Sequence, residues 1–250
     1  MSDGPFSPPP VALSGDEAHI WFVRQDSICD SNSIDRYAAI LSDDERKQWR
    51  RFRFEKHRHA YLVAHALVRT SLSRYCDVDP MVWQFARNRY GRPDISFPAE
   101  WRPLRFNLSH TTGMVAVIVA WGREVGVDVE WNDRPNLGAS IANRYFSPRE
   151  VRDLQALPKD IQQRAFFNYW TLKEAYIKAR GMGLSIPLDQ FSFRLRSAEP
   201  ISISFAPELV DDPATWYFER HAPSKCHTLS LAVRRLADAS PRVIIRETVP

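Results

Sequence analysis

The spacing of hydrophobic residues changes along the chain and divides it into helical and extended segments. Residues 17–24, EAHIWFVR, alternate between apolar and polar as a strand does. Ser42 and Glu45 have the spacing of a capping box that opens a helix over residues 43–54, and residues 57–75 carry apolar side chains at helical spacing. After the first strand, the first third of the chain is therefore predicted to be mainly helical.

From Trp83 onward, short apolar runs alternate with turn residues, which predicts strands joined by tight connections in an antiparallel sheet. These strands are expected at residues 82–88, 104–110, 114–121 and 125–131, with a turn at residues 90–95. Ser147, Pro148 and Glu150 then stand at helix-start positions, and a long amphipathic helix is expected from residue 161 to residue 180, before Gly181. Further strands are expected at residues 191–196, 201–205, 215–220 and 227–235.

The order of elements, a strand followed by helices and further strands, occurs twice and predicts an α+β fold. We expect two similar subdomains, each a small antiparallel sheet packed with helices, although no close internal sequence repeat proves a duplication. The expected parts are a flexible Pro-rich tail at residues 1–15, subdomains at residues 16–125 and 126–235, and a C-terminal tail or edge strand at residues 236–250.

Composition and charge limit the class of protein. Of 250 residues, 44% are hydrophobic, which is ordinary for a globular protein. No apolar run approaches the ~20 residues that span a bilayer, and the N-terminus lacks a signal-peptide pattern, so we expect a cytoplasmic protein without a membrane partner. Cys29, Cys76 and Cys226 are far apart and indicate neither a disulfide framework nor a zinc site. The net charge of +4 indicates an anionic partner, without selecting among nucleic acid, a phosphorylated cofactor and an acidic protein.

Two carboxylates lie side by side in the predicted strand VGVDVEW at residues 125–131. Alternation places Asp128 and Glu130 on one face, where they repel each other unless a cation or solvent separates them. Oxygen ligands of this kind suit Mg²⁺, whose coordination is usually completed by substrate phosphates. The alternative is a strand whose polar face lies in water.

Two further pairs could carry chemistry. Glu174 and Lys178 are four residues apart on the predicted long helix and share a face, which by spacing alone is typical of a surface ion pair. The helix around them is apolar on nearly every side, which favours a charged stripe that faces a cleft. Ser109 and His110 are adjacent on a strand and point to opposite faces, so they are not a nucleophile and its base. The two remaining interpretations are that they contact phosphate or that they are ordinary polar residues at the end of a strand.

Four blocks, FNLSHTTG, VGVDVE, YFSPRE and WTLKEAYIKARGMGLSIPLDQFSF, occur in this order, and together they resemble the signature of the Sfp-type phosphopantetheinyl transferases. YGRP resembles an upstream element of that family. The resemblance implies a Mg²⁺-dependent enzyme that transfers the phosphopantetheine arm of coenzyme A to a serine of an acyl or peptidyl carrier protein and releases adenosine 3′,5′-bisphosphate. It also implies an active site at the interface of two subdomains related by a pseudo-twofold axis.

The resemblance assigns expected roles to individual residues. Asp128, Glu130 and Glu174 would hold the metal, and Glu174 would also be the general base toward the serine hydroxyl. Asp128, Glu174 and Lys178 are the expected catalytic residues, with Lys178 against the pyrophosphate. Lys173 would position Glu174 or bind phosphate.

Other positions follow the family pattern less closely. The further residues expected to contact the cofactor are Arg92, Ser109, His110, Arg46 and Arg58. Arg92 stands where the family usually has lysine. Glu150 matches a family glutamate but also fits the capping box behind Ser147, which we favour. Gly126 would leave room for the cofactor beside Asp128.

By this resemblance the attacking serine would belong to the partner, so no nucleophile is required in this chain. Carrier proteins of this kind are typically acidic, which fits the basic net charge, and we expect docking at residues 136–146 of a monomeric enzyme. Two alternatives stay open. One is Mg²⁺-dependent phosphotransfer or nucleotide hydrolysis on another substrate. The other is a nucleic-acid-binding module, suggested by interleaved basic and aromatic residues at 46–59. If the chain is a transferase, we expect no nucleic-acid partner.

Overall fold

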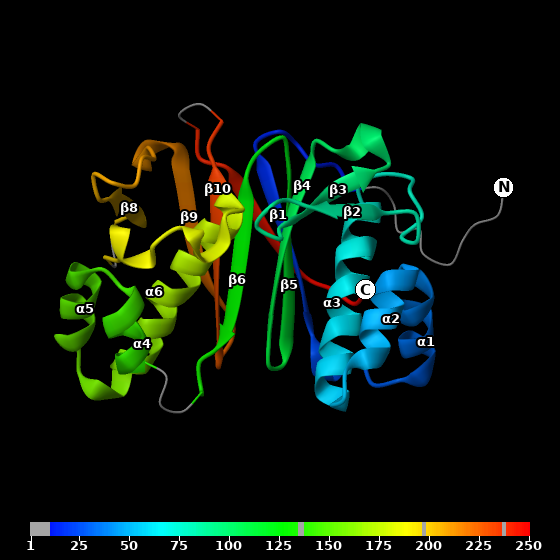
Figure 1. The fold of residues 1–250 in the computed structure, drawn as a ribbon, viewed down its shortest axis with the longest axis horizontal. Helices are drawn as coiled ribbons and strands as arrows, with labels where there is room; N and C mark the ends of the chain where they lie inside the picture. Colours follow the sequence, from blue (N-terminus) through cyan, green and yellow to red (C-terminus); the bar gives the residue numbers. More distant parts are fainter. Residues whose placement is uncertain (1–10, 135–137, 197–198, 237–238) are drawn as a thin grey trace. The chain divides into compact units, whose positions relative to one another are not determined.

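The helices and strands of the chain confirm the predicted α+β class (Figure 1). The computed structural model describes residues 11–134, 138–196, 199–236 and 239–250. Contacts divide the chain into two units. The described residues of the first unit lie within Met1–Arg87, Pro93–Gly122 and Arg242–Pro250, and those of the second within Asn88–Arg92 and Arg123–Pro241.

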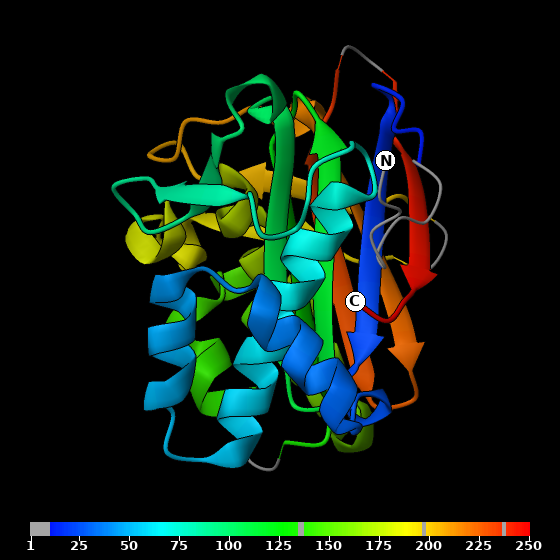
Figure 2. The ribbon, with the colours of Figure 1, turned by 90° about the vertical axis from the view of Figure 1, so that its right-hand side faces the viewer.

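The first unit is built on a four-stranded sheet. Its strands, in spatial order, are β11 (Arg242–Glu247), β1 (Glu17–Arg24), β5 (Met114–Trp121) and β4 (Leu104–Thr111). β1 and β4 pair antiparallel with β5, whereas β11 pairs in parallel with β1 and forms the edge of the sheet (Figure 2). Sequentially distant segments therefore complete this sheet.

The single antiparallel sheet predicted for residues 82–131 is wrong, because these strands belong to three different sheets. β2 (Gln84–Arg87) and β3 (Pro93–Phe97) form a hairpin of their own, and only β4 and β5 join the first sheet. β6 (Val125–Trp131) belongs to the second unit, where it pairs with β10. Local alternation identified the strands, but their partners depend on distant segments.

Helices cover one face of the first sheet. They are α1 (Ser31–Ile40), α2 (Asp43–Arg51) and α3 (Glu55–Ser73), with short 3-10 turns at Gln25–Ser27 and Ala99–Trp101. The predicted capping box is confirmed at the start of α2, where Ser42 and Glu45 bond each other's backbone N–H. α1 was not predicted; its N-cap is Asp30, whose side chain accepts a hydrogen bond from the backbone of Ser33.

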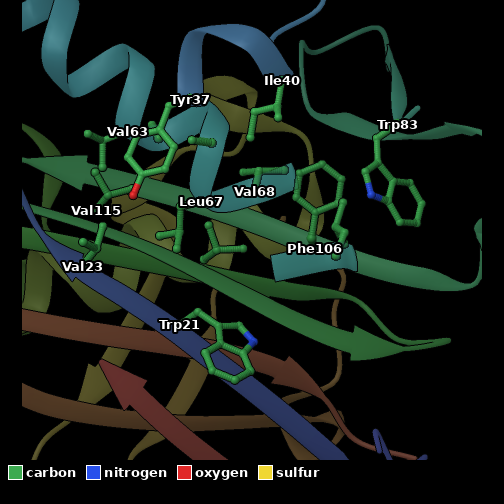
Figure 3. Packing of buried hydrophobic residues seen from close by; sticks show 14 of the residues in the cluster. Trp21, Val23, Tyr37, Ile40, Val63, Leu67, Val68, Trp83, Phe106 and Val115 are labelled. Carbon is green, nitrogen blue, oxygen red and sulfur yellow. The ribbon is translucent and has the colours of Figure 1, made fainter. Parts of the chain in front are cut away.

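The core of the first unit lies between α3 and the sheet. Leu67 of α3 and Val115 of β5 are fully buried, and Trp21 of β1 belongs to the same cluster (Figure 3). Val11 and Leu13 pack against this cluster. These two residues of the predicted flexible tail are therefore part of the packed structure.

The second unit combines a three-stranded sheet with a long helix. The strands, in spatial order, are β6, β10 (His227–Arg234) and β9 (Trp216–Ser224), all antiparallel, and a separate hairpin is formed by β7 (Phe191–Arg194) and β8 (Ser202–Phe205). The helices are α4 (Gly138–Tyr145), α5 (Pro148–Gln155) and α6 (Lys159–Arg180), with 3-10 turns at Gly183–Ser185, Leu188–Gln190 and Pro213–Thr215. α6 packs along β6 and β10 (Figure 1).

α6 ends where the sequence predicted, because Gly181 adopts a left-handed conformation with φ of 63°. Aromatic side chains of α6 make the core of this unit, among them Phe166, Phe167 and Tyr176. Among the described residues, no helix is both long enough and apolar enough to cross a membrane.

Candidate active site

β6 and α6 approach so closely that there is no space for a side chain at Gly126. A Cβ added there would overlap the carbonyl oxygen of Ala175 and lie 2.6 Å from the backbone nitrogen of Ala179. One turn earlier on the same face of α6, Thr171 Oγ1 lies 2.7 Å from Ser230 Oγ of β10. The expectation that Gly126 leaves room for a cofactor is therefore wrong: the space beside it is filled by the backbone of α6.

This close packing brings the charged residues of the two elements together. Asp128 follows Gly126 by two residues and shares its face of β6. Glu174 and Lys178 each precede a small residue of the helix face that packs on this strand. Lys178 Nζ donates a hydrogen bond to Asp128 Oδ1 at 2.6 Å. Asp128 is only 4% exposed, and the side chain of Lys178 is 26% exposed, so the ion pair is partly shielded from solvent.

The carboxyl of Glu174 is perturbed by the same arrangement. Burial raises its pKa from the ordinary 4.5 to about 7; the negative charges of Asp128 and Glu130 add to the increase, while Lys178 opposes it. A carboxyl with a pKa near neutrality can accept a proton at physiological pH and release it again. Glu174 thus has the property required of a general base.

Glu130, the second carboxylate of the strand, has a partner that the sequence reasoning missed. Its Oε2 lies 3.5 Å from Nη2 of Arg134, and its side chain is 17% exposed. The four-residue spacing between Glu130 and Arg134 was visible in the sequence, but the turn after β6 rather than a helix brings the two together. Asp128 and Glu130 therefore each face a cation supplied by this chain.

The donor set fits a magnesium ion in its chemistry. The three carboxylates Asp128, Glu130 and Glu174 are hard oxygen donors, and two of them raise the pKa of the third, a repulsion that a divalent cation relieves. Within the described part of the chain, no group of three or more His, Cys, Asp and Glu side chains is placed to hold a metal by itself. A magnesium ion held here would therefore need water and substrate phosphates as further ligands.

Comparison with known proteins decides the family. The model of the 4′-phosphopantetheinyl transferase superfamily matches residues 124–233, which contain all these charged residues, and the model of the 4′-phosphopantetheinyl transferase N-terminal domain matches residues 30–122. The chain belongs to the 4′-phosphopantetheinyl transferase family. It is accordingly a transferase, as the sequence resemblance implied.

Two relatives illustrate the extent of the similarity. The transferase is 34% identical to the 4′-phosphopantetheinyl transferase HetI of a Nostoc species over 82% of this chain and 87% of the relative. It is 32% identical to the 4′-phosphopantetheinyl transferase Sfp of Bacillus subtilis over 81% of this chain and 86% of the relative. Among solved structures, the holo-[acyl-carrier-protein] synthase of Neisseria meningitidis matches 45% of this chain and 98% of its own, with 15% identity and a TM-score of 0.38.

Lys173, expected to position Glu174 or to bind phosphate, is fully buried within the second unit of the transferase. Its Nζ lies 2.7 Å from Glu150 Oε2 and donates to the carbonyl oxygens of Leu188 and Phe191, each at 2.7 Å. Burial lowers the pKa of Lys173, and the charge of Glu150 opposes this. The structure contradicts a phosphate contact, because the ammonium is enclosed and its donors are used. Its contacts instead join this turn of α6 to Glu150 of α5 and to the backbone of Leu188 and Phe191.

Glu150 has the capping role that we favoured. Its Oε2 accepts hydrogen bonds from the backbone N–H and the hydroxyl of Ser147, each at 3.0 Å, and its Oε1 accepts one from the N–H of Phe193 at 2.8 Å. The same carboxylate therefore joins α5 to β7 and, through Lys173, to α6. Sequence reasoning found the cap but missed this buried ion pair.

Arg92 lies at the C-terminal end of α6. Its Nη1 donates to the carbonyl oxygen of Ala179 at 2.8 Å, and the neighbouring Asn88 donates from Nδ2 to the carbonyl oxygen of Gly181 at 2.8 Å. A guanidinium at this end of a helix interacts favourably with the helix dipole. Arg92 and Lys178 are therefore carried at the same end of α6, and the phosphate contact expected of Arg92 stays a prediction.

The remaining expected contacts belong to the first unit. On β4, Ser109 is buried and His110 is exposed, which confirms that they face opposite sides of the strand. Arg46 donates from Nη2 to the carbonyl oxygens of Ala39 and Leu41, at 3.2 and 3.0 Å, and so caps the end of α1. Arg58 forms an ion pair with Glu55 in the first turn of α3. Their contribution to a site shared with the second unit stays a prediction.

The segment expected to dock the carrier protein, residues 136–146, begins outside the described residues. From Gly138 to Tyr145 it forms α4, which packs against α5 and α6. Docking of a carrier protein on this segment stays a prediction.

Proposed function

We propose that the transferase moves the 4′-phosphopantetheine arm of coenzyme A to a serine hydroxyl of an acyl or peptidyl carrier protein. The observation that carries this proposal is the meeting of Asp128 and Glu130 on β6 with Glu174 and Lys178 on α6. This arrangement combines a carboxyl of raised pKa with a neighbouring ammonium and two further carboxylates. The names of the relatives, which are phosphopantetheinyl transferases, support the type of group that is transferred.

The reaction requires one bond to form and one to break at phosphorus. The serine oxygen attacks the phosphorus that carries the pantetheine, and the bond to the bridging oxygen of the pyrophosphate breaks, so that adenosine 3′,5′-bisphosphate leaves. Glu174 takes the proton of the serine hydroxyl, directly or through a water molecule. In the metal-free chain, burial raises the pKa of this carboxyl to about 7, in the range suited to a general base. The nucleophile comes from the carrier protein.

Lys178 is the group best suited to the charge on the pyrophosphate. Its side chain is 26% exposed while its Nζ remains bonded to Asp128, so the ammonium is fixed in direction and still accessible. A fixed cation beside the breaking bond stabilises the negative charge that moves onto the leaving oxygen. Arg92, at the same end of α6, could add a second phosphate contact.

Magnesium is part of the proposal. Asp128, Glu130 and Glu174 would hold the ion, which supplies positive charge to the pyrophosphate oxygens and relieves the repulsion among the carboxylates. The chain itself contributes the direction of these carboxylates, because the close contact of β6 with α6 leaves the two elements little freedom to shift.

The proposed partners are coenzyme A and an acidic carrier protein. The excess of basic residues, 34 against 30 acidic ones, favours association with an acidic protein. A monomeric enzyme in the cytoplasm, without a nucleic-acid partner, stays a prediction from the sequence.

The decisive experiment uses coenzyme A and the apo-carrier proteins of the host. Each carrier is incubated with enzyme and Mg²⁺, and mass spectrometry measures whether phosphopantetheine is added to one serine. A carrier with this serine replaced by alanine, and a reaction with EDTA, should give no product. Product formed from coenzyme A without any carrier would instead indicate a hydrolase, and tight binding of bulk DNA with a steep salt dependence would indicate the nucleic-acid module.

A further inference from the structure

A cavity of about 520 Å³ lies in the second unit, among α5, α6, β7 and β9. Four arginines line it: Arg149 on α5, Arg194 and Arg196 at the end of β7, and Arg220 on β9. Asp153 is the single acidic residue among the described residues that line the cavity. We call this cavity the arginine pocket.

The arginine pocket is separate from the candidate active site. Tyr169 lines the pocket, whereas Lys178 lies nine residues later on α6. At 3.6 residues per turn, nine residues correspond to about two and a half turns, so these two side chains leave the helix on opposite sides. The body of α6 therefore stands between the pocket and the Asp128–Lys178 ion pair. A ligand of the pocket would not be a substrate of the proposed transfer.

Two of the four arginines in the arginine pocket have no acidic partner among the described residues. Arg149 faces Asp153 at 3.9 Å, and Arg196 pairs with Glu199 at 2.9 Å. Among the described residues, the side chains of Arg194 and Arg220 form no ion pair or hydrogen bond. Like charges that converge on one cavity repel each other, and an anion bound between them relieves this repulsion.

Neutral groups of the pocket complement these charges. The pKa of Tyr169 is raised to about 12, chiefly by burial and then by the charge of Asp153, so its hydroxyl stays protonated and can donate a hydrogen bond at neutral pH. Leu157, Leu195 and Ile201 supply an apolar wall. Small-molecule sites typically have volumes of roughly 300–1,000 Å³ and combine an apolar lining with a few polar groups.

We propose that the arginine pocket binds a small organic molecule that carries phosphate groups. Guanidinium groups form paired, charge-assisted hydrogen bonds with phosphate oxygens, and the apolar wall fits the organic part of such a ligand. The concave shape favours a small molecule over a protein surface. Because the pocket and the active site share α6, a ligand here contacts the helix that carries Glu174. The inference does not depend on the proposed transfer reaction.

The test is a calorimetric titration of the full chain with tripolyphosphate and with ATP, in EDTA. The pocket variant is Arg194→Gln/Arg220→Gln. The matched control, Arg152→Gln/Lys159→Gln, removes the same number of exposed cations. These two lie on helices of this unit, and neither lines the pocket. Lys178→Ala serves as the active-site variant. Circular dichroism and thermal unfolding establish that each variant is folded.

We expect the pocket variant to lose one binding event or to bind roughly tenfold more weakly, since two charge-assisted contacts are removed. The matched control should change affinity by less than about twofold. Lys178→Ala should retain the event. Equal affinity in the pocket variant and the matched control would overturn the proposal. So would a pocket variant that binds tripolyphosphate normally but binds an acidic carrier protein more weakly, because the pocket would then be a docking surface for a protein.

Discussion

Lys178 on α6 bonds to Asp128 on β6 through a contact of 2.6 Å between Nζ and Oδ1. The contact unites two motifs that are fifty residues apart in the sequence. It also means that the ammonium is held beside the carboxylates rather than swinging freely in solvent. The site is thus built around a fixed pair of opposite charges, and both members can be tested.

Replacement of Lys178 by alanine should lower the rate of arm transfer by roughly 100-fold or more, as removal of one fixed electrostatic group typically does. Mg²⁺ should still bind, because the three carboxylates remain. Steady-state kinetics with a saturating carrier protein measure the rate, and calorimetry measures the metal. Lys159→Ala, at the exposed start of the same helix, is the control and should keep full activity. An unchanged rate in Lys178→Ala would remove Lys178 from the pyrophosphate.

Replacement of Asp128 by asparagine should nearly abolish transfer and weaken Mg²⁺ binding, while the protein remains folded. Asparagine keeps the shape of the side chain but removes the negative charge that a hard cation requires. The transfer rate is measured across a range of Mg²⁺ concentrations. Partial recovery at high Mg²⁺ would agree with a metal role, whereas full activity at low Mg²⁺ would contradict it.

The raised pKa of Glu174 predicts a pH-dependent stability of the metal-free protein. In the folded chain this carboxyl takes up a proton near pH 7, and in the unfolded chain near pH 4.5. Between these values the folded state binds more protons, so the contribution of Glu174 to the free energy of unfolding is present below pH 4.5 and is lost as the pH rises to 7. Glu174→Gln should remove this slope and be more stable than the wild type at pH 8.

Urea unfolding in EDTA at pH 5 and pH 8 tests this directly. The free energy of unfolding of Glu174→Gln, relative to that of the wild type, should increase as the pH rises. Mg²⁺ should reduce the difference, because a cation favours the ionised carboxylate. Parallel pH profiles for the two proteins would show that the Glu174 carboxyl is not perturbed.

Features that depend on neighbouring residues in the sequence could be predicted. The capping boxes at Ser42 and Ser147 and the end of α6 at Gly181 follow from backbone chemistry within a few residues. The shared face of Asp128 and Glu130 followed from the alternation of a strand. These local rules located the charged residues of the site before any contact between elements was known.

Features that depend on pairing between distant segments could not be predicted from the sequence. The parallel pairing of β11 with β1 joins the two ends of the described chain, and no short-range pattern indicates it. The sequence does not show that α6 packs against Gly126, so the space beside this residue could not be assigned to the helix backbone. The sequence leaves Lys173 two roles, to position Glu174 or to bind phosphate. Its partner Glu150 lies on another helix, and only the fold shows that both residues are enclosed.

The buried ion pair between Lys173 and Glu150 predicts a large loss of stability when one partner is removed. Lys173→Met should lower the free energy of unfolding by roughly 3–5 kcal/mol, because it leaves an enclosed carboxylate without its cation. Replacement of Asp153, which forms an exposed pair with Arg149, should lower the free energy of unfolding by less than about 1 kcal/mol. Urea unfolding gives both values. A small loss for Lys173→Met would show that the pair does not hold α6 in place.

Gly126→Ala tests the contact that places β6 against α6. The added methyl group meets the backbone of Ala175 and Ala179, which cannot rotate away as a side chain could, so the helix must shift. Overpacking of this kind costs roughly 1–3 kcal/mol, and we expect the displaced helix to carry Glu174 and Lys178 away from Asp128. The transfer rate should therefore fall even under conditions in which the variant is fully folded.

The control is Gly15→Ala, since nothing lies within 4 Å of a Cβ added at Gly15. Thermal unfolding and transfer kinetics should be nearly unchanged in this variant. The two alanine substitutions add the same atoms, so their difference isolates the helix-strand contact from a general effect of replacing glycine. If Gly126→Ala kept both wild-type stability and wild-type activity, close packing of α6 on β6 could not be what fixes the geometry of the charged site.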